Sequence, residues 1–445
     1  MTNDNIAALS TGNVKSGVAV IRISGDSPLS VAEKMFRPTG KIAVCDFAPN
    51  HMYVGEIIAD GFSDFGMCVY FKGPNSFTGE DTVEFHSHGG TAITQGILKK
   101  IFSLGVRPAT NGEFTKRAFI NGKLSLSSAE GLIDMINSES ASGVRAGYYL
   151  YREKFLKRIE AIQDKLTDVL SEIDVDMDFP EEDLQVTSTE NANRLTSECL
   201  QELNAIISSY RLGRAIKDGV KVGIIGKPNT GKSSTLNALL QYDKAIVSPI
   251  AGTTRDIVEG SLDINGVRFN FSDTAGIRQS DDVIEELGVN LSKRVRNESD
   301  IILFIIDGSN FDNYDESVFS LIKDKTSLVV INKTDISNFK DDRADLYISA
   351  LKNENIDKLK QALYNRFFDS GIDISGDFLT EERHYDALNR AIECLTMALN
   401  SLRSVSLDLV AIDIKNGWDA LGEISGKTAT EEIINNIFAK FCVGK

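Results

Sequence analysis

The stretch Gly226-Lys-Pro-Asn-Thr-Gly-Lys-Ser233 decides the fold of the region around it. Its two glycines, separated by four residues and followed by Lys232 and Ser233, have the spacing of a phosphate-binding loop. The apolar run 220–225 predicts a buried strand before the loop, and 234–240 predicts the start of a helix after it. Glycines allow the tight turn that points N–H groups at phosphate oxygens. We predict that Lys232 contacts the β- and γ-phosphates and that the Ser233 hydroxyl binds Mg²⁺.

Four further motifs follow this loop in an order typical of GTP-binding domains. Asp273-Thr-Ala-Gly276 ends a predicted strand, so its aspartate can hold Mg²⁺ through water and its glycine N–H can meet the γ-phosphate. Asn332-Lys-Thr-Asp335 ends another, and its carboxylate can accept the two guanine donors that adenine lacks. Ser349-Ala-Leu351 would bring a backbone N–H to guanine O6. Gly252-Thr-Thr-Arg-Asp256 supplies Thr254 for the metal.

The catalytic group of this GTPase is not evident from these motifs. Ile277 stands where many GTPases have a water-orienting glutamine, and an apolar side chain cannot orient a nucleophile. Arg255 and Arg278 are candidates for an arginine finger. Alternatively, the group comes from the acids that follow Ile277, which are Asp281, Asp282, Glu285 and Glu286.

The composition indicates an ordinary soluble protein. Of its 445 residues 42% are hydrophobic and 25% charged, as in globular proteins, and the length suggests about three domains. The sequence has no run of 18 or more apolar residues and no secretory signal, so we expect no membrane span. The five cysteines form no Cys-x-x-Cys pair, which favours a reducing cytoplasm over disulfides or zinc; they are Cys45, Cys68, Cys199, Cys394 and Cys442.

The net charge of −16 excludes nucleic-acid binding by bulk electrostatics. The charge is uneven, because six bases lie within 99–123 against the single acid Glu113, and seven acids lie within 172–183. Such runs are usually solvated faces. Any contact with nucleic acid is therefore expected to be local, or to depend on a partner.

Hydrophobic periodicity predicts a multidomain protein. Short β-rich runs with two helical stretches predict an N-terminal α+β domain. Helical spacing over 127–212 predicts long helices broken once, at 174–183, and helical spacing resumes after Gly376. Alternating strands and helices between them predict a parallel, doubly wound α/β sheet. We expect the two helical segments to form one domain with the GTPase domain inserted; the predicted limits are 1–119 (α+β), 120–213 (helical), 214–370 (GTPase) and 371–445 (helical).

Several stretches outside the GTPase region are also distinctive. They are Ile21-Arg-Ile-Ser-Gly25, Gly73-Pro-Asn-Ser-Phe-Thr-Gly-Glu-Asp81 with His88-Gly-Gly90, Gly112-Glu-Phe-Thr-Lys-Arg-Ala-Phe-Ile-Asn-Gly-Lys-Leu124 and the terminal Phe441-Cys-Val-Gly-Lys445. They resemble the signatures of the MnmE (TrmE) family of bacterial tRNA-modification GTPases, with Val443 where that family usually has Ile. Unrelated GTPases share the phosphate loop but not these flanks, and the resemblance covers nearly the whole chain.

The resemblance implies a reaction and its partners. Members of this family act as homodimers with a flavoprotein, MnmG, in a heterotetrameric complex. They place an aminomethyl or carboxymethylaminomethyl group on C5 of the wobble uridine of tRNA. A 5,10-methylene- or 5-formyl-tetrahydrofolate carries the one-carbon unit, and glycine or ammonium supplies the amine.

The resemblance also implies a folate site. Its residues would be Arg22, Glu84, Lys123 and Lys445, where the cations suit the glutamate tail of folate and the carboxylate suits donors on the pterin edge. Cys442 matches a near-terminal cysteine of the family, which is either catalytic or an inert buried thiol.

Hydrolysis in this family is stimulated by K⁺ and by dimerisation of the GTPase domains. The K⁺ positions match Asn229, Ser248, Ile250 and Thr253, and the catalytic glutamate matches Glu285. The ion would provide the positive charge that an arginine finger provides elsewhere. Leu351 departs from the lysine usual at its position, although a backbone contact to guanine would survive the change.

These inferences give a complete set of expected sites. The catalytic residues are Lys232, Glu285 and Cys442, and the Mg²⁺ ligands are Ser233 and Thr254. The residues expected to contact GTP are Asn229, Thr230, Gly231, Lys232, Ser233, Ser234, Ser248, Pro249, Ile250, Ala251, Gly252, Thr253, Thr254, Asp273, Thr274, Ala275, Gly276, Asn332, Lys333, Thr334, Asp335, Ser349, Ala350 and Leu351. The alternative is a ribosome-assembly or regulatory GTPase switch without one-carbon chemistry, which would instead carry a basic RNA-binding module.

Overall fold

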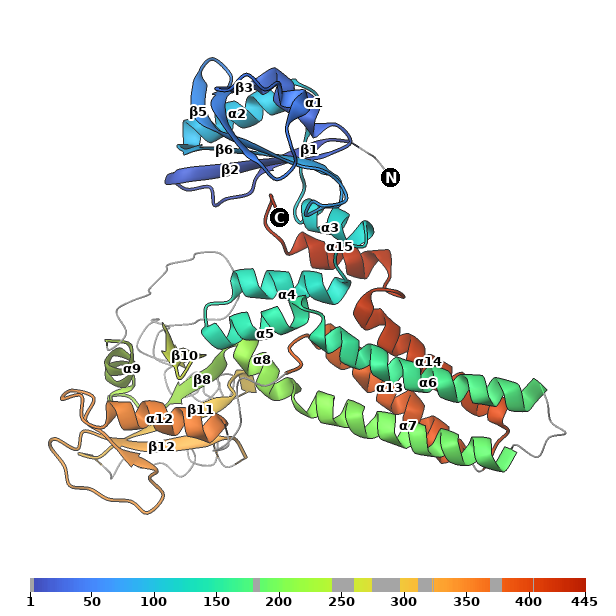
Figure 1. The fold of residues 1–445 in the computed structure, drawn as a ribbon. Coiled ribbons are helices and arrows are strands. Elements are labelled where there is room, and N and C mark those ends of the chain that lie inside the picture. Colours follow the sequence, from blue (N-terminus) through green and yellow to red (C-terminus); the bar gives the residue numbers. More distant parts are fainter. Residues whose placement is uncertain are drawn as a thin grey trace, which may run out of the picture. The chain divides into compact units, whose positions relative to one another are not determined.

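The computed structural model describes residues 4–178, 185–241, 260–273, 297–310, 322, 324–368, 378–402 and 404–445. The chain forms two compact units (Figure 1). The first contains Met1–Ile133, Tyr149–Cys199 and Arg390–Lys445, and the second contains Asp134–Tyr148 and Leu200–Asn389. The domain limits predicted from the sequence stay a prediction. No helix among the described residues has the length and hydrophobicity needed to cross a membrane.

The first unit contains a seven-stranded sheet in the order β3-β4-β5-β6-β2-β1-β7. Neighbouring strands are antiparallel except β1 and β7, which are parallel. The strands are β1 (Ile6–Leu9), β2 (Ser16–Gly25), β3 (Phe36–Pro38), β4 (Met52–Ile58), β5 (Ser63–Phe71), β6 (Asp81–Gly89) and β7 (Arg107–Pro108). The predicted α+β character of this region is confirmed.

One face of this sheet is buried under α1 (Pro28–Met35) and α2 (Thr91–Ser103). Side chains of a strand alternate between faces, so Ile21 and Ile23 of β2 enter the core, whereas Arg22 between them lies on the other face. This alternation places a charged side chain in the sheet without burying it in the apolar core.

The helical part of the first unit joins segments far apart in the sequence. Helix α6 (Lys154–Asp178) packs against α14 (Leu407–Ser425). Gln163 Nε2 donates to the Trp418 carbonyl oxygen at 2.9 Å, and the Trp418 indole donates to Thr167 Oγ1 at 3.1 Å. The two helical segments therefore pack together, as predicted. The other helices here are α3 (Glu113–Ile120) and α15 (Glu431–Ala439), while α4 (Leu126–Asn137), α5 (Ala141–Tyr151), α7 (Gln185–Ser208) and α13 (Glu382–Ser401) extend into the second unit.

The prediction of helices broken only once was wrong. The chain also breaks between α4 and α5 and between α5 and α6, where Glu153 has a φ of 59°. Helix α6 continues to Asp178, beyond the predicted start of the acidic break at Asp174. Spacing of apolar residues reports a helical period, but it does not detect a short corner that keeps the same faces buried.

The second unit is built on a six-stranded sheet in the order β13-β12-β11-β8-β10-β9. Its strands are β8 (Val220–Ile225), β9 (Gly260–Ile264), β10 (Val267–Asp273), β11 (Ile301–Asp307), β12 (Ser327–Asn332) and β13 (Leu346–Tyr347), and its described helices include α8 (Tyr210–Asp218), α9 (Lys232–Gln241) and α12 (Ile356–Phe367). Strands β8 and β10 to β13 are parallel, as predicted.

Strand β9 corrects the prediction of an entirely parallel sheet, because it pairs antiparallel with β10. The two strands are joined by Asn265 and Gly266, which have φ values of 54° and 83°. An Asn-Gly pair with positive φ is the preferred connection of a tight hairpin. The Asn265-Gly266 pair in the sequence was therefore sufficient to predict this hairpin.

Candidate functional site

The phosphate loop connects β8 to α9, as its spacing predicted. A Cβ on Gly226 would lie 2.4 Å from the Ile305 carbonyl oxygen. Gly231 has a φ of 93°, and a Cβ there would lie 2.2 Å from Asn332 Nδ2. Both glycines are therefore required, because any side chain would collide with β11 or with the Asn332 amide.

The ammonium of Lys232 lies over this loop. Its Nζ donates to the carbonyl oxygens of Gly226 and Lys227, each at 2.9 Å, and only 8% of the residue is exposed. Ser233, the second residue of α9, is exposed. A cation and a hydroxyl held at a helix N-terminus fit the β- and γ-phosphates and Mg²⁺ that these residues are predicted to bind.

Asn332 joins the phosphate loop to the loop that is predicted to recognise guanine. Its Nδ2 donates to the Thr230 carbonyl oxygen, and its Oδ1 accepts the Ala350 N–H, both at 3.0 Å. The amide of Ala350, from the segment assigned to guanine O6, is thus engaged by Asn332 in this structure. A buried asparagine that hydrogen-bonds to both loops fixes their separation.

The carboxylate predicted to bind guanine is also oriented. Ser349 Oγ donates to Asp335 Oδ1 at 2.7 Å, and this hydrogen bond lowers the pKa of Asp335 below its ordinary value. Asp335 therefore stays ionised, as an acceptor of two guanine N–H groups must be. Within the same motif, Lys333 has a φ of 67° and pairs with Asp307 Oδ2 at 2.6 Å.

Asp307 was missed by the sequence reasoning. It ends β11, and burial raises its pKa, but bonds from Lys333 and Ser309 outweigh burial and leave the pKa lowered. The available signal was an acid at the carboxyl end of a parallel strand, which is where such sheets bind ligands.

Asp273, the aspartate predicted to hold Mg²⁺ through water, is the last described residue of its segment. Asp273 is the last residue of β10 and pairs with Ile224 of β8. Many of the remaining predicted residues lie outside the described part of the chain; they are Ser248, Pro249, Ile250, Ala251, Gly252, Thr253, Thr254, Arg255, Thr274, Ala275, Gly276, Ile277, Arg278, Asp281, Asp282, Glu285 and Glu286.

In the first unit, Arg22 and Glu84 form an ion pair on the sheet face opposite α1 and α2. Arg22 Nε and Nη2 both lie 2.8 Å from Glu84 Oε1. The guanidinium carbon is 5.3 Å from the Phe77 ring centroid and 5.7 Å from that of Phe114. Burial raises the pKa of Glu84, but the hydrogen bonds and charges of His86 and Arg22 lower it by more. The pKa is therefore below its ordinary value, and the carboxyl stays ionised.

The C-terminal tail is seated on the same sheet. A Cβ on Gly444 would lie 2.1 Å from the Leu9 carbonyl oxygen, and Val443 forms a β-bridge with Asn111. Leu9 faces Ile21, the neighbour of Arg22 on β2. The tail therefore lies against β1, the strand next to the one that carries Arg22. The N–H of the last residue, Lys445, donates to the carbonyl oxygen of Cys442, which is exposed.

Lys123 reaches the loop between β5 and β6, where its Nζ donates to the Pro74 carbonyl oxygen at 2.9 Å. Phe77, which contacts the Arg22 guanidinium, belongs to the same loop. The structure therefore pairs Arg22 with Glu84 and attaches Lys123 to the loop that packs on Arg22.

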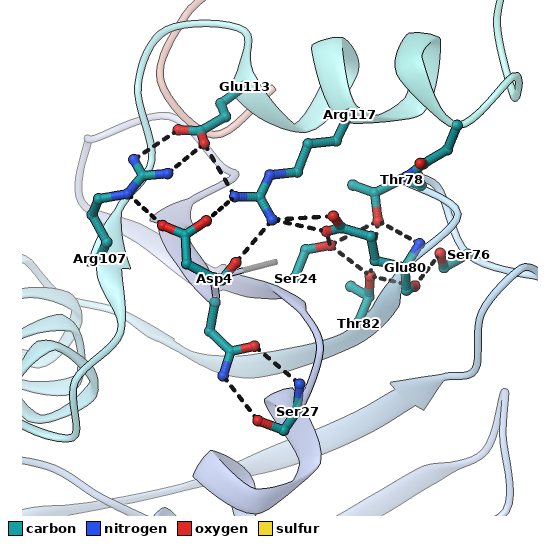
Figure 2. A network of polar contacts seen from close by, with 12 residues as sticks. Asp4, Ser24, Ser27, Ser76, Thr78, Glu80, Thr82, Arg107, Glu113 and Arg117 are labelled. Atoms are coloured by element: carbon teal, nitrogen blue, oxygen red, sulfur yellow. Dashed lines mark hydrogen bonds and ion pairs between the residues drawn. The ribbon is translucent and has the colours of Figure 1, made fainter. Parts of the chain in front are cut away.

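A network of polar contacts holds this loop in place (Figure 2). Arg117 donates to both carboxylate oxygens of Glu80 at 3.1 Å, to Asp4 Oδ1 at 2.8 Å and to Glu113 Oε1 at 3.2 Å. Arg107 binds the same Asp4 and Glu113. These two bases of the run 99–123 are therefore structural, and sequence reasoning did not foresee their carboxylate partners.

Comparison with known proteins identifies the family. Residues 126–442 match the model of the MnmE helical domain, and residues 5–123 match that of the GTP-binding protein TrmE N-terminus. The chain belongs to the MnmE family. It is 38% identical over 460 residues to the tRNA modification GTPase MnmE of Natranaerobius thermophilus, with 100% of both chains covered. It is 36% identical to that of Clostridioides difficile, with 100% of this chain and 99% of the relative covered.

As a member of the MnmE family, the protein is a GTP hydrolase that acts in tRNA modification, and it uses GTP and Mg²⁺. This membership displaces the alternative of a ribosome-assembly or regulatory switch. Among solved structures, an Era variant of Aquifex aeolicus bound to GDP.AlF4- is 31% identical over 40% of this chain and 67% of that one, with a TM-score of 0.27. The FeoB G-domain of Methanococcus jannaschii is 21% identical over 33% of this chain and 97% of its own, with a TM-score of 0.26.

Proposed function

We propose that this MnmE family member is a K⁺-dependent GTPase that uses a tetrahydrofolate one-carbon unit to modify tRNA. With a flavoprotein partner, MnmG, it would install an aminomethyl or carboxymethylaminomethyl group at C5 of the wobble uridine. The protein would work as a homodimer in the cytoplasm.

The observation that carries this proposal is the Arg22–Glu84 pair beside the seated C-terminal tail. Glu84 accepts from Arg22 through one oxygen, and the other lies 3.3 Å from His86 Nε2. An ionised carboxylate has about four acceptor sites, so capacity remains for the N–H groups of a pterin edge. Phe77 and Phe114 supply flat apolar walls.

The cations of this region would hold the carboxylates of the folate glutamate tail. Lys123 is exposed, and Lys445 lies on the tail that contacts Leu9. A tetrahydrofolate bound there would supply the one-carbon unit. The exposed thiol of Cys442 is then within the same segment as Lys445, where it could act as a nucleophile.

In the GTPase unit, Lys232 and Ser233 would hold the phosphates and Mg²⁺, and Asp335 would select guanine. Asn229 is exposed on the phosphate loop with a φ of 63°, so its amide oxygen is available to a cation beside the phosphates. Potassium bound there would stabilise charge that gathers in the transition state. Glu285 would then position water.

The decisive experiment separates the one-carbon site from the GTP site. We expect Gly444→Ala to weaken binding of 5-formyl-tetrahydrofolate by about tenfold or more, because a Cβ would displace the tail from Leu9. Removal of residues 442–445 should abolish folate binding and modification, while GTP affinity stays unchanged in both variants. Isothermal titration with each ligand measures this.

Gly105→Ala is the matched control, because Gly105 has a φ of 90° but a Cβ there would meet no atom within 4 Å. It should bind folate normally. Full-strength folate binding by the truncated protein would exclude the tail from the pocket. Mass spectrometry of tRNA nucleosides from a deletion strain, with and without the intact gene, identifies the modified base.

A further inference from the structure

The corner between α5 and α6 has an unusual concentration of exposed positive charge. Four bases within residues 152–158, which we call the basic corner, are all exposed; they are Arg152, Lys154, Lys157 and Arg158. The segment contains one acid, Glu153. In a chain of net charge −16, a local patch of this kind is what binding to a polyanion requires.

The one acid of the segment is held away from these bases. Ser128 Oγ donates to Glu153 Oε1 at 3.1 Å, so the carboxylate is directed to α4. Glu153 also has a φ of 59°, a left-handed conformation that costs a residue with a Cβ on the order of 1 kcal/mol. The Glu153 carboxylate therefore points to Ser128 of α4 and does not form an ion pair with the neighbouring bases.

The four bases are also unpaired within the part of the chain that the structure describes, where no carboxylate forms an ion pair with any of them. Exposed bases on other helices do have partners, as in Arg194–Glu198, Arg390–Glu423 and Lys415–Asp419. Solvated isolated bases are common, but four in one corner repel one another. The repulsion is relieved when an anion binds.

Their position on α6 adds to this cost. Lys154 begins the helix, Lys157 and Arg158 follow within the first turns, and no acid lies in the first turn. A cation at a helix N-terminus opposes the macrodipole and costs about 0.3–1 kcal/mol. Phe155 and Leu156 between them are buried, so the corner is anchored to the core. The arrangement is unfavourable for the protein alone and favourable for an anionic partner.

We propose that the basic corner binds the phosphate backbone of tRNA. The substrate of this family is itself a polyanion, whereas the competing basic run at 99–123 has Arg107 and Arg117 bound to carboxylates and Lys99 paired with Asp60. The corner contacts phosphates rather than bases, so it positions tRNA without reading its sequence.

The corner is joined through packed residues to the candidate one-carbon site in the same unit. Glu153 is bonded to Ser128 of α4, and Leu126 and Ala129 of α4 pack against Phe438 and Phe441. Phe441 immediately precedes the tail that sits on β1. A tRNA held at the corner is therefore docked on the unit that carries Arg22 and Glu84. This inference depends on tRNA as substrate and not on the folate chemistry.

The test uses the full-length chain with Arg152→Gln, Lys154→Gln, Lys157→Gln and Arg158→Gln combined. Binding to unmodified tRNA is measured by fluorescence anisotropy over a series of KCl concentrations. For every phosphate that the variant no longer neutralises, the slope of log K against log salt should fall in magnitude by about 0.7–0.9. We expect a total decrease of about 2 to 4 in this slope, weaker binding at every salt concentration, and unchanged GTP affinity.

Two controls make the result specific. Lys34→Gln with Lys41→Gln removes exposed bases elsewhere in the first unit and should leave the slope unchanged. The double variant Lys154→Arg with Lys157→Arg keeps the positive charge and should also leave the salt slope unchanged. Thermal unfolding of the fourfold variant should be unaffected or shifted upward, because cations are removed from a helix N-terminus.

An unchanged salt slope and affinity in the fourfold variant would overturn the proposal. Normal tRNA binding combined with loss of flavoprotein binding would also overturn it, since the corner would then be a protein interface. The single variant Lys157→Gln, with an expected slope change of about one unit or less, decides the matter if the fourfold variant does not fold. Failure of the folate experiment would leave this result unaffected.

Discussion

The Asn332 side chain donates a hydrogen bond of 3.0 Å to the Thr230 carbonyl oxygen, although the two residues lie 102 positions apart. Through this bond the end of β12 is attached to the phosphate loop, and the bond from Ala350 attaches the third loop. One buried amide thus fixes the separation of the loop predicted to bind the phosphates from the loops predicted to bind guanine.

We therefore predict that Asn332→Ala weakens GTP binding and lowers the free energy of unfolding of the GTPase unit by about 1–3 kcal/mol. The substitution leaves the Thr230 carbonyl and the Ala350 N–H without their partner. Nucleotide titration and chemical denaturation followed by circular dichroism measure the two effects. Asn270→Ala is the matched control, because Asn270 also donates to a backbone carbonyl, that of Asp218, but at an exposed site. Equal effects in the two variants would contradict the bridging role.

Asp335→Asn should exchange guanine for xanthine specificity. In the predicted site the ionised carboxylate would accept two N–H groups of guanine, whereas an amide would present a donor to one of them and would suit the acceptor of xanthine. We expect GTP binding to weaken at least about 100-fold and xanthosine triphosphate binding to improve. Competition between the two nucleotides for the variant provides the measurement. Unchanged GTP affinity would remove Asp335 from the base site.

A half-buried cluster of charged side chains lies where the chain enters and leaves the GTPase sheet. Lys217 of α8 pairs with Asp134 Oδ1 at 2.9 Å and with Glu381, just before α13. Burial raises the pKa of Asp134 strongly, and the charge of Glu381 raises it further, while Lys217 opposes the shift. Two carboxyls thus share one ammonium, and Asp134 retains its proton far above the ordinary range.

This arrangement predicts a pH dependence of stability. Below the ordinary aspartate pKa both the folded and the unfolded chain are protonated at Asp134. Above it the unfolded chain releases the proton and the folded chain keeps it, so stability falls as pH rises towards the raised pKa. Asp134→Asn mimics the protonated form, since its oxygen can accept from Lys217 and its amide can donate to Glu381.

We expect Asp134→Asn to be more stable than the unmodified protein at pH 8, by about 1–2 kcal/mol, but not at pH 5. Urea denaturation at the two pH values measures this difference. Asp134→Ala should be less stable at both pH values, because it removes one acceptor from the half-buried ammonium of Lys217. A pH dependence that is identical in the Asn variant and the unmodified protein would refute the shared-proton arrangement.

For the proposed ion mechanism, turnover of GTP should rise steeply when K⁺ replaces Na⁺ at constant ionic strength. Na⁺ is smaller and would require the same oxygen ligands to close in around it. Asn229→Ala should lose this dependence with little change in GTP affinity, whereas Glu285→Ala should lose the rate but keep K⁺-dependent dimerisation. Equal rates in both salts for the unmodified protein would instead favour Arg255 or Arg278 as the source of positive charge.

The GTP-binding motifs were predictable because their meaning depends on short-range geometry. Gly226 and Gly231 must turn the chain before a helix, and Lys232 follows at a fixed distance along the backbone. The strands β8 and β10 to β12 could likewise be read from apolar runs. The β9–β10 hairpin was also accessible, through the Asn265-Gly266 pair. The family resemblance singled out Arg22 and Glu84, which periodicity alone would have treated as ordinary strand residues.

The sequence by itself determined the nucleotide-binding loop, the use of GTP and the alternation of strands and helices around that loop, since these depend on sterics and periodicity over a few residues. Only the tertiary structure decided which charges meet. Arg22 and Glu84 are 62 residues apart in the sequence and pair across β2 and β6. Arg117 of the basic run 99–123 forms ion pairs with Asp4 and Glu80. The close backbone contact between Gly444 and Leu9 likewise brings together segments from the two ends of the chain. Such contacts depend on strand register and helix packing, and local sequence patterns contain no information about either.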